Sequence, residues 1–232
     1  MNSDDIKKSC AKEALKYIKN NTIIGLGGGS TISFLIQYIR NDDLKVKIVT
    51  PSFTTRKLCL ESGLEVLPSS SVHHISVAFD GCDEVDEDLN ALKSGGGIHT
   101  KEKLIASMAE HYILLVDESK FVERLTFRHP VVLEILEDAL GYVENTVITL
   151  GGKPALRTST AKDGYTVSDN GHLLLDVFFE QVTDTPTLQN RLKNICGVIE
   201  TSLFTHEVTD VLVAGAEGIR VVTKQERGAI HG

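Results

Sequence analysis

Charged side chains stand next to glycines at two closely spaced points of the sequence. Asp80-Gly81-Cys82-Asp83-Glu84 follows an apolar run, so its carboxylates come at the end of an expected strand. Lys93 then opens a glycine-rich loop, residues 93–97, and Glu102 stands at the start of an expected helix. Together they would supply a proton shuttle, a cation beside free backbone N–H groups and a general base, which suits proton transfer next to a carbonyl group.

An earlier glycine-rich loop, Gly25-Leu26-Gly27-Gly28-Gly29-Ser30-Thr31, precedes a helical pattern. Its free N–H groups and two hydroxyls would lie at a helix N-terminus, where phosphates bind. A dinucleotide is disfavoured, because Ile32-Ser33 stands where the fingerprint has its third glycine and strand 46–49 ends without an acidic residue. The loop predicts a site for a phosphate or another polar ligand; a plain tight turn is the alternative.

Composition and charge favour a soluble globular protein that binds a small molecule. The chain has 232 residues, 41% hydrophobic and 24% charged, as ordinary globular proteins have. A net charge of -8 without a basic stripe argues against nucleic-acid binding. The sequence shows neither a signal-like apolar segment nor a run approaching the roughly 18 apolar residues of a membrane span. We therefore expect a cytoplasmic protein with no membrane or nucleic-acid partner.

Neither the cysteines nor the histidines show the spacing of metal ligands. The eight histidines form no H-x-x-x-H or H-E-x-x-H pattern, and no cysteines form a C-x-x-C pair. We therefore predict a protein of a reducing compartment, with neither a metal site nor a disulfide framework. Its four cysteines are Cys10, Cys59, Cys82 and Cys196.

Short apolar strands alternate with helical patterns in the first part of the chain. This predicts an α/β fold with a Rossmann-like parallel sheet and helices on both faces. Because ligands bind beyond the carboxyl ends of parallel strands, residues 27–31, 80–83 and 117–120 would line one crevice. We expect strands at 22–26, 46–49, 65–67, 75–79 and 112–116, and helices from a Ser3 cap, at 32–39, at 55–62 and at 101–109 after a Thr100 cap.

The regular alternation of strands and helices gives way to shorter strands near Pro130, which predicts a smaller α+β domain at 130–205. It would contain strand 131–135, a helix within 138–148, a hairpin turning at Asp169-Asn170-Gly171, and a helix from Thr185-Pro186. Strands 211–214 and 219–223 would return to the first sheet. We thus predict a catalytic domain of 1–129 with 206–224, the smaller domain, and a tail at 225–232.

Several acidic residues have less specific interpretations. We interpret Glu84, Asp86, Glu87 and Asp88 as a solvated acidic loop, because they lack the spacing of a calcium site. Glu102 at a helix start would interact with the helix dipole, which would keep its carboxylate ionised at neutral pH.

In these stretches the sequence resembles the type A family of ribose-5-phosphate isomerases, from Ile6 to about Lys224. The resemblance depends on an ordered set of motifs, each of which is weak alone. They are Gly27 to Thr31, Asp80 to Glu84, Leu92 to Gly97, Thr100 to Lys103, Asp117 to Lys120 and Ser168 to Gly171.

The resemblance implies Glu102 as the catalytic base and Asp80 and Asp83 as assisting carboxylates. Lys93 and the N–H groups of the glycine loop that follows it would stabilise an oxyanion. Phosphate would be bound by Ser30, Thr31 and either Lys120 or Lys7. The implied substrate-binding residues are Gly28, Gly29, Ser30, Thr31, Asp80, Gly81, Cys82, Asp83, Lys93, Ser94, Gly95, Gly96 and Lys120.

The sequence departs from the family pattern at three positions. Gly28 stands where threonine is common, Cys82 where alanine is common, and Ser94 where the family usually has glycine. A left-handed backbone at Ser94 would cost a non-glycine residue about 1 kcal/mol or more.

The implied activity is an aldose-ketose isomerisation of D-ribose 5-phosphate and D-ribulose 5-phosphate in the non-oxidative pentose phosphate pathway. It would run through an enediolate, without a metal or an organic cofactor. We expect a homodimer. Alternatives are a non-catalytic sugar-phosphate sensor, which would normally carry a DNA-binding segment, and an amino-sugar-phosphate deaminase or CoA transferase. The deaminase would need a histidine in the site, and the transferase a glutamate nucleophile beside a larger cleft.

Overall fold

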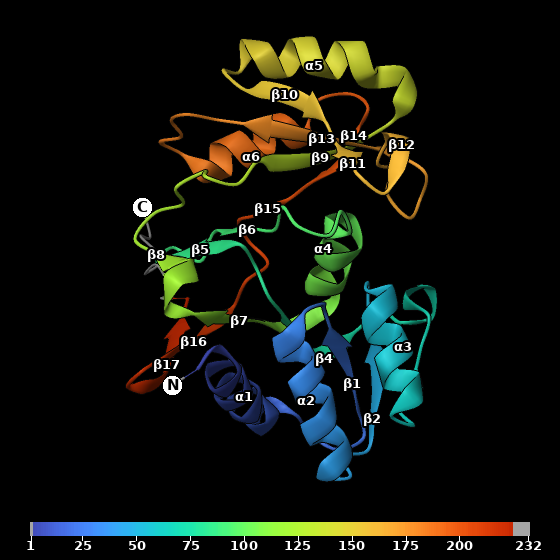
Figure 1. Ribbon diagram of the computed structural model, residues 1–232, viewed down its shortest axis with the longest axis vertical. Coiled ribbons are helices and arrows are strands. Elements are labelled where there is room, and N and C mark those ends of the chain that lie inside the picture. The colour runs from blue at the N-terminus through green and yellow to red at the C-terminus, as the bar shows by residue number, and fades with distance from the viewer. Residues whose placement is uncertain (1, 225–232) are drawn as a thin grey trace, which may run out of the picture.

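The computed structural model describes residues 2–224, so the predicted tail lies outside the described residues (Figure 1). Its largest sheet has seven strands in the order β17-β16-β7-β4-β1-β2-β3. All neighbours pair in parallel except β16 and β17, which pair antiparallel. The strands are β1 (Thr22–Leu26), β2 (Val46–Val49), β3 (Glu65–Val66), β4 (Ile75–Asp80), β7 (Ala109–Asp117), β16 (Asp210–Gly215) and β17 (Gly218–Thr223).

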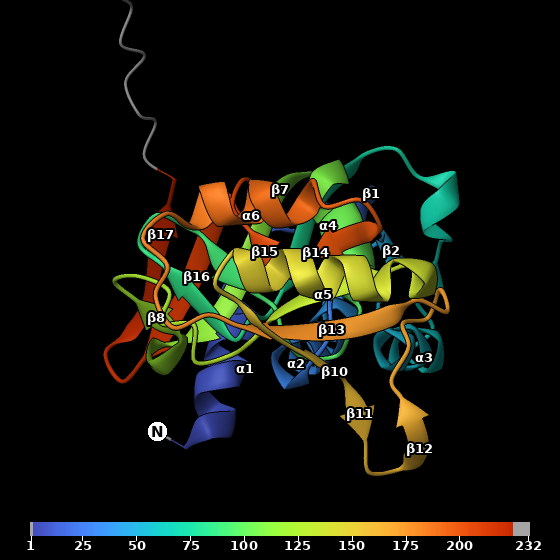
Figure 2. The same cartoon turned by 90° about the horizontal axis from the view of Figure 1, so that it is seen from above.

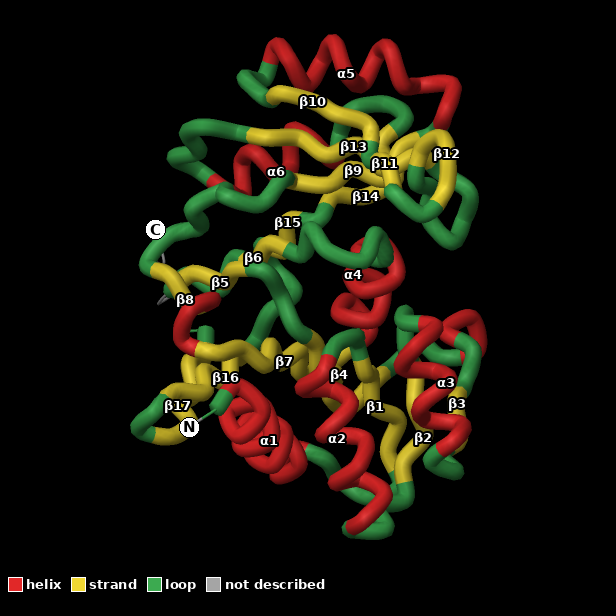
Figure 3. The backbone as a smooth tube through the Cα atoms, in the orientation of Figure 1, coloured by secondary structure: helices red, strands yellow, loops and turns green. Residues whose placement is uncertain are grey.

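Helices cover both faces of this sheet, as the strand and helix alternation predicts (Figure 3). Along β7, Ile113 and Leu115 pack in one apolar cluster, while Tyr112 and Leu114 pack in the cluster on the other face. The first face is covered by α1 (Ser3–Ala14), α2 (Ser30–Asn41) and α3 (Phe53–Glu61), and the second by α4 (His99–Met108).

The chain reverses direction across the sheet between β1 and β4. From β1 it proceeds outward to β2 and β3, and it then returns to place β4 on the other side of β1. The loops that follow β1 and β4 therefore diverge from neighbouring strand ends, which is where open α/β sheets bind ligands.

A second sheet lies above α4 in Figure 1 and has four strands in the order β10-β13-β9-β14. Leu133 and Ile135 of β9 pack with two helices on one face, while Glu134 points to the opposite face and accepts a hydrogen bond from Thr100 of α4. Figure 2 shows the helices of this layer from above. The elements are β9 (Val131–Ile135), β10 (Lys153–Leu156), β13 (Leu173–Phe178), β14 (Val198–Thr201), α5 (Leu140–Thr149) and α6 (Thr185–Lys193).

Short strands link the two layers. A four-stranded sheet, ordered β15-β6-β5-β8, was not expected from the sequence. We propose that the two larger layers are separate domains with the boundaries predicted above. The short strands are β5 (Glu84–Asp86), β6 (Ala91–Leu92), β8 (Phe121–Val122), β15 (Leu203–Phe204) and the separate pair β11 (Thr158–Ser159) and β12 (Lys162–Tyr165). The 3-10 helices are Leu15–Tyr17, Ser69–Ser71, Glu118–Lys120 and Glu137–Ala139.

The prediction of a solvated acidic loop is wrong for Glu84 and Asp86, which are both buried. The carboxylate of Glu84 accepts hydrogen bonds from the backbone N–H of Thr126 at 2.8 Å and from its hydroxyl. Asp86 accepts from the backbone N–H of Asn90 at 2.8 Å and from its side-chain amide. These donors replace water, so the two carboxylates organise the turns around β5.

The predicted hairpin at Asp169-Asn170-Gly171 is present only as its turn and a single antiparallel bridge. A tight turn is present, but β12 pairs with β11, whereas β13 pairs with β10 and β9. Across the turn the ladder is one isolated bridge between Val167 and Leu173. The turn residues fix the local reversal of the chain, while partners distant in sequence decide the pairing.

Two predicted helix caps, Ser3 and Thr100, are wrong. Asn2 caps α1 in place of Ser3, and its side chain accepts the N–H of Asp5 at 2.8 Å. Helix α4 begins at His99 without a side-chain cap, because the Thr100 hydroxyl donates to Glu134 instead. None of the helices within residues 2–224 has the length and apolar character to cross a membrane.

Candidate active site

The carboxylate of Asp80, at the end of β4, lies directly over the loop that follows β1. Its Oδ1 accepts the N–H of Gly81 at 2.8 Å and of Gly28 at 3.3 Å. A Cβ atom at Gly27 would stand 1.9 Å from this oxygen. Position 27 must therefore be glycine for Asp80 to occupy this place.

A buried ion cluster joins Asp80 to Lys93 and Glu102. The Nζ atom of Lys93 lies 3.1 Å from Asp80 Oδ2 and 3.3 Å from Glu102 Oε1, and it donates to the carbonyl of Gly81. The three residues are 3–7% exposed and come from β4, the position directly after β6 and the first turn of α4. The fold thus brings together three of the four predicted catalytic side chains.

Burial and mutual attraction set the proton affinities in this cluster. Burial lowers the pKa of Lys93, but the neighbouring Asp80 and Glu102 carboxylates more than reverse this and raise it above its ordinary value. Burial raises the pKa of Glu102, Lys93 lowers it and Asp80 raises it, and the net shift is upward. Glu102 is therefore a stronger base than an exposed glutamate, which the dipole argument from sequence did not anticipate.

One carboxylate oxygen of Glu102 is free to accept a hydrogen bond. Its Oε2 atom is buried and has no hydrogen-bond partner among residues 2–224, while Oε1 faces Lys93. A buried carboxylate oxygen without a donor is uncommon, and this one is positioned to accept a proton.

Two aromatic side chains that sequence reasoning missed support the cluster. Tyr112 is fully buried in β7 and donates its hydroxyl to Asp80 Oδ2 at 3.1 Å. Its ring stacks on Phe204 with centroids 6.0 Å apart. The Phe204 ring centre lies 5.8 Å from Nζ of Lys93 and 4.9 Å from Nζ of Lys103. The sequence feature that could have revealed Tyr112 is its polar hydroxyl in an otherwise apolar run, residues 112–116.

Asp83 organises the second glycine loop. Its Oδ2 accepts the N–H groups of Ser94 at 2.6 Å and Gly95 at 3.2 Å. The left-handed conformations in this loop fall on Gly96 and Gly97, with φ of 70° and 68°, and not on Ser94. Serine is accommodated without backbone strain, and its hydroxyl donates to the carbonyl of Pro130 at 2.5 Å.

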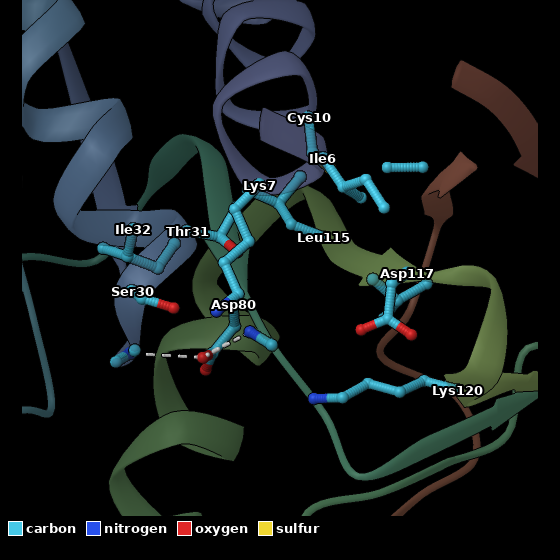
Figure 4. A pocket seen from close by; sticks show the side chains of 15 residues that line it. Ile6, Lys7, Cys10, Ser30, Thr31, Ile32, Asp80, Leu115, Asp117 and Lys120 are labelled. Carbon is cyan, nitrogen blue, oxygen red and sulfur yellow. Dashed lines mark hydrogen bonds between the residues drawn. The ribbon is translucent and has the colours of Figure 1, made fainter. Parts of the chain in front are cut away.

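A pocket of about 160 Å³ lies beside Asp80, at the N-terminus of α2 (Figure 4). Its cations are Lys7 of α1 and Lys120, whose Nζ also donates to the carbonyl of Cys82 at 2.8 Å. Gly29 at the helix N-cap has φ of 100°, a conformation that suits glycine. The predicted site residues that line the pocket are Gly28, Gly29, Ser30, Thr31, Asp80, Gly81 and Lys120.

The other predicted site residues lie outside the pocket lining. Lys93 and Glu102 connect to it through Asp80, and Asp83 holds the neighbouring loop. Cys82 is buried, and burial raises the pKa of its thiol to about 12, which makes it unreactive. The remaining predicted residues outside the lining are Ser94, Gly95 and Gly96.

Within residues 2–224, no three His, Cys, Asp or Glu side chains are grouped so that they could hold a metal ion. At the centre of the site, the ammonium of Lys93 lies between two carboxylates.

Comparison with known proteins agrees with this geometry. The model of the family described as ribose 5-phosphate isomerase A (phosphoriboisomerase A) matches residues 47–218. The chain belongs to this family. Ribose-5-phosphate isomerase A of a Synechococcus strain is 39% identical over 227 residues, which cover 95% of this chain and 97% of the relative. The same enzyme of Methanothermobacter thermautotrophicus is 38% identical over 94% of this chain and 97% of its own.

Solved structures of ribose 5-phosphate isomerase A share the whole fold. The enzyme of Methanocaldococcus jannaschii superposes with a TM-score of 0.89 at 35% identity, covering 96% of this chain and all of the other. A D-ribose-5-phosphate isomerase in complex with phospho-erythronic acid gives a TM-score of 0.91 at 34% identity, with the same coverage of 96% and 100%. The predicted α/β fold is thereby confirmed.

Two adjacent glycines provide a test of the packing around Asp80. Gly27→Ala should reduce the free energy of unfolding by about 1–3 kcal/mol, because the new methyl group would displace the Asp80 carboxylate. Gly28→Ala is the control, since its methyl would meet atoms no closer than 3.7 Å, and its effect should stay within about 0.5 kcal/mol. Urea unfolding measures both, and equal stabilities of the two variants would contradict the packing argument.

Proposed function

We propose that this chain interconverts D-ribose 5-phosphate and D-ribulose 5-phosphate through an enediolate. The observation that carries the proposal is the buried Lys93 ammonium between Asp80 and Glu102, next to a pocket with a helix N-terminus and two lysines. Family membership and relatives named ribose-5-phosphate isomerase A support it. The isomerase relative in complex with phospho-erythronic acid supports a phosphorylated substrate.

Glu102 is the proposed base that removes the C2 proton of the open-chain aldose and returns it to C1. Its pKa is raised mainly by burial, which increases the affinity of its deprotonated form for a proton. Its unpartnered Oε2 is the proposed accepting atom. One carboxylate can serve both carbons, because they are adjacent.

Lys93 is the proposed stabiliser of the enediolate oxygens. The N–H groups of Ser94 and Gly95, which the sequence suggested for this role, already donate to Asp83. The ammonium therefore carries the charge stabilisation, and a single preorganised donor of this kind is worth about 3–4 kcal/mol in the transition state. Asp80 would assist ring opening and move protons between O1 and O2, while Asp83 would hold the loop and orient substrate hydroxyls.

The pocket at α2 is the proposed phosphate site. Ser30 and Thr31 supply hydroxyls at a helix N-terminus, and Lys7 and Lys120 supply positive charge. Helix N-termini favour anions through free N–H groups and the helix dipole. Binding energy gained there would position the reacting carbons beside Glu102.

The alternative functions fit the site less well. A non-catalytic sensor would not need a buried glutamate of raised pKa beside a cation. A deaminase would require a histidine in the site, and none is among the described residues that line the pocket. The homodimer and the cytoplasmic location remain predictions.

Glu102→Gln should abolish isomerisation and change ribose 5-phosphate binding by less than about tenfold, because the amide keeps its size but cannot accept the proton. A coupled assay measures turnover, and calorimetry measures binding. Glu87→Gln, at an exposed carboxylate, is the control and should retain full activity. More than a few per cent of activity in Glu102→Gln would remove Glu102 from the role of base.

The pH dependence of kcat/KM should reflect the raised pKa of Glu102. Since the deprotonated form is required, activity falls as the pH drops through this pKa, and the acid limb should lie above the value of about 4.3 typical of an exposed glutamate. Lys93 lowers the pKa of Glu102, so Lys93→Ala should move the acid limb of its residual activity to higher pH. An unshifted limb in that variant would contradict the proposed coupling.

Isomerisation in deuterium oxide should place deuterium at C1 of ribulose 5-phosphate. A carboxylic acid that carries the abstracted proton exchanges it with solvent while the enediolate persists. NMR of the product distinguishes this route from a hydride shift, which would retain the substrate's own C2 hydrogen completely. Complete retention would exclude the enediolate mechanism even if isomerisation were observed.

A further inference from the structure

Among the first five residues of α4, all except Glu102 contact the second sheet or the turn 168–172 next to it. Helix α4 lies between the two sheets (Figures 1 and 3). The ring of His99 contacts the carbonyl of Glu200 at 3.3 Å, and Lys101 pairs with Asp169 at 2.8 Å. Thr100 donates its hydroxyl to Glu134.

Lys103 completes this set of contacts. Its buried ammonium lies 3.0 Å from Glu200 and donates to the carbonyls of Thr201 at 2.8 Å and Leu203 at 2.7 Å. Glu102 alone in this turn has its side chain in the cluster with Lys93. The second sheet therefore holds the helix that carries the proposed base.

Glu134 is the buried charge at the centre of this attachment. Its side chain is 1% exposed, and the apolar residues on either side of it in β9 face the opposite side of the sheet. Its Oε1 accepts from Ser168 at 2.7 Å and Asn170 at 3.3 Å and contacts Nδ1 of His172 at 2.7 Å. Its Oε2 accepts only from Thr100, among the hydrogen bonds within residues 2–224.

The two oxygens of Glu134 therefore connect two separate segments. One oxygen holds the turn 168–172, and the other holds the first turn of α4. Burial raises the pKa of Glu134, but its hydrogen bonds, with Thr100 first, lower the pKa overall. A buried carboxylate with this many donors stays charged and fixes the geometry of its partners.

We propose that Glu134 is a positioning residue that acts through Thr100 to hold the Glu102 carboxylate in place against Lys93. The inference relies on the proposed role of Glu102 as the base. Catalytic groups must be held within about 0.5 Å of their productive position, and a shift of about 1 Å can lower a rate about 100-fold. The substrate's phosphate would bind elsewhere, so the effect should fall on turnover.

The experiment compares three single substitutions in the full chain. Thr100→Val removes the hydroxyl that donates to Glu134 with little change in shape, whereas Thr100→Ser keeps a hydroxyl at that position. Ser168→Ala removes the hydroxyl that donates to the other carboxylate oxygen of Glu134. Ser168 has no contact with α4 among the described hydrogen bonds. The measurements are kcat and KM for ribose 5-phosphate and the melting temperature of each variant.

Thr100→Val should lower kcat at least tenfold with KM changed less than about threefold, and Thr100→Ser should recover kcat to within about threefold of the unaltered chain. Ser168→Ala should lower the melting temperature at least as much as Thr100→Val while keeping kcat within about twofold. A merely structural role would instead make kcat follow the melting temperature in all three variants.

The inference is overturned if Thr100→Val keeps its kcat, or if Ser168→Ala loses as much turnover as Thr100→Val. These outcomes leave the proposed function intact, because the unaltered chain would still isomerise the substrate. Absence of isomerisation by the unaltered chain would instead contradict the proposed function, and the positioning role of Glu134 with it.

Discussion

A single buried ammonium between two carboxylates is the interaction on which the rest of this structure depends. Removing three charges from water costs several kcal/mol for each ion unless they are paired closely. Lys93 meets this requirement through Asp80, Glu102 and the carbonyl of Gly81. The three charged groups come from a strand of the large sheet, a short linking strand and a helix between the sheets. The large sheet, the linking strands and α4 must therefore all be in place for the charge to be neutralised.

The two larger layers position different parts of this cluster. The large sheet supplies the switch point where the loops after β1 and β4 separate, which places Asp80 beside the pocket. The second sheet turns its helix-covered face to its own apolar core and its polar residues toward α4. The pocket beside Asp80 and the buried carboxylate of Glu102 are thus held by different parts of the chain and still lie close together.

Much of this arrangement could be predicted from local sequence. The strands β1, β2 and β9 have the predicted bounds because each is a short apolar run, and the glycine loops marked the candidate site. What local patterns could not provide were partners from distant segments. Glu84 was interpreted as solvated because its hydrogen-bond donors, in Thr126, lie 42 positions away in the sequence. Tyr112 and Glu134 were recognised only as parts of strands, because the hydrogen bonds of their side chains reach other elements. The segments that flank the turn at residues 169–171 likewise pair mainly with other strands, which the local pattern could not show.

Phe204 lies beneath both Lys93 and Lys103, with its ring centre 5.8 Å and 4.9 Å from the two ammonium nitrogens. One ring therefore contacts a cation of the candidate active site and a cation that attaches α4 to β14. Substitutions at residues that share a partner do not act independently. The effects of changing Phe204 and either lysine should be non-additive in a double-mutant cycle. Sequence change at these three positions is then constrained jointly, so a tolerated replacement at one depends on which residues occupy the other two.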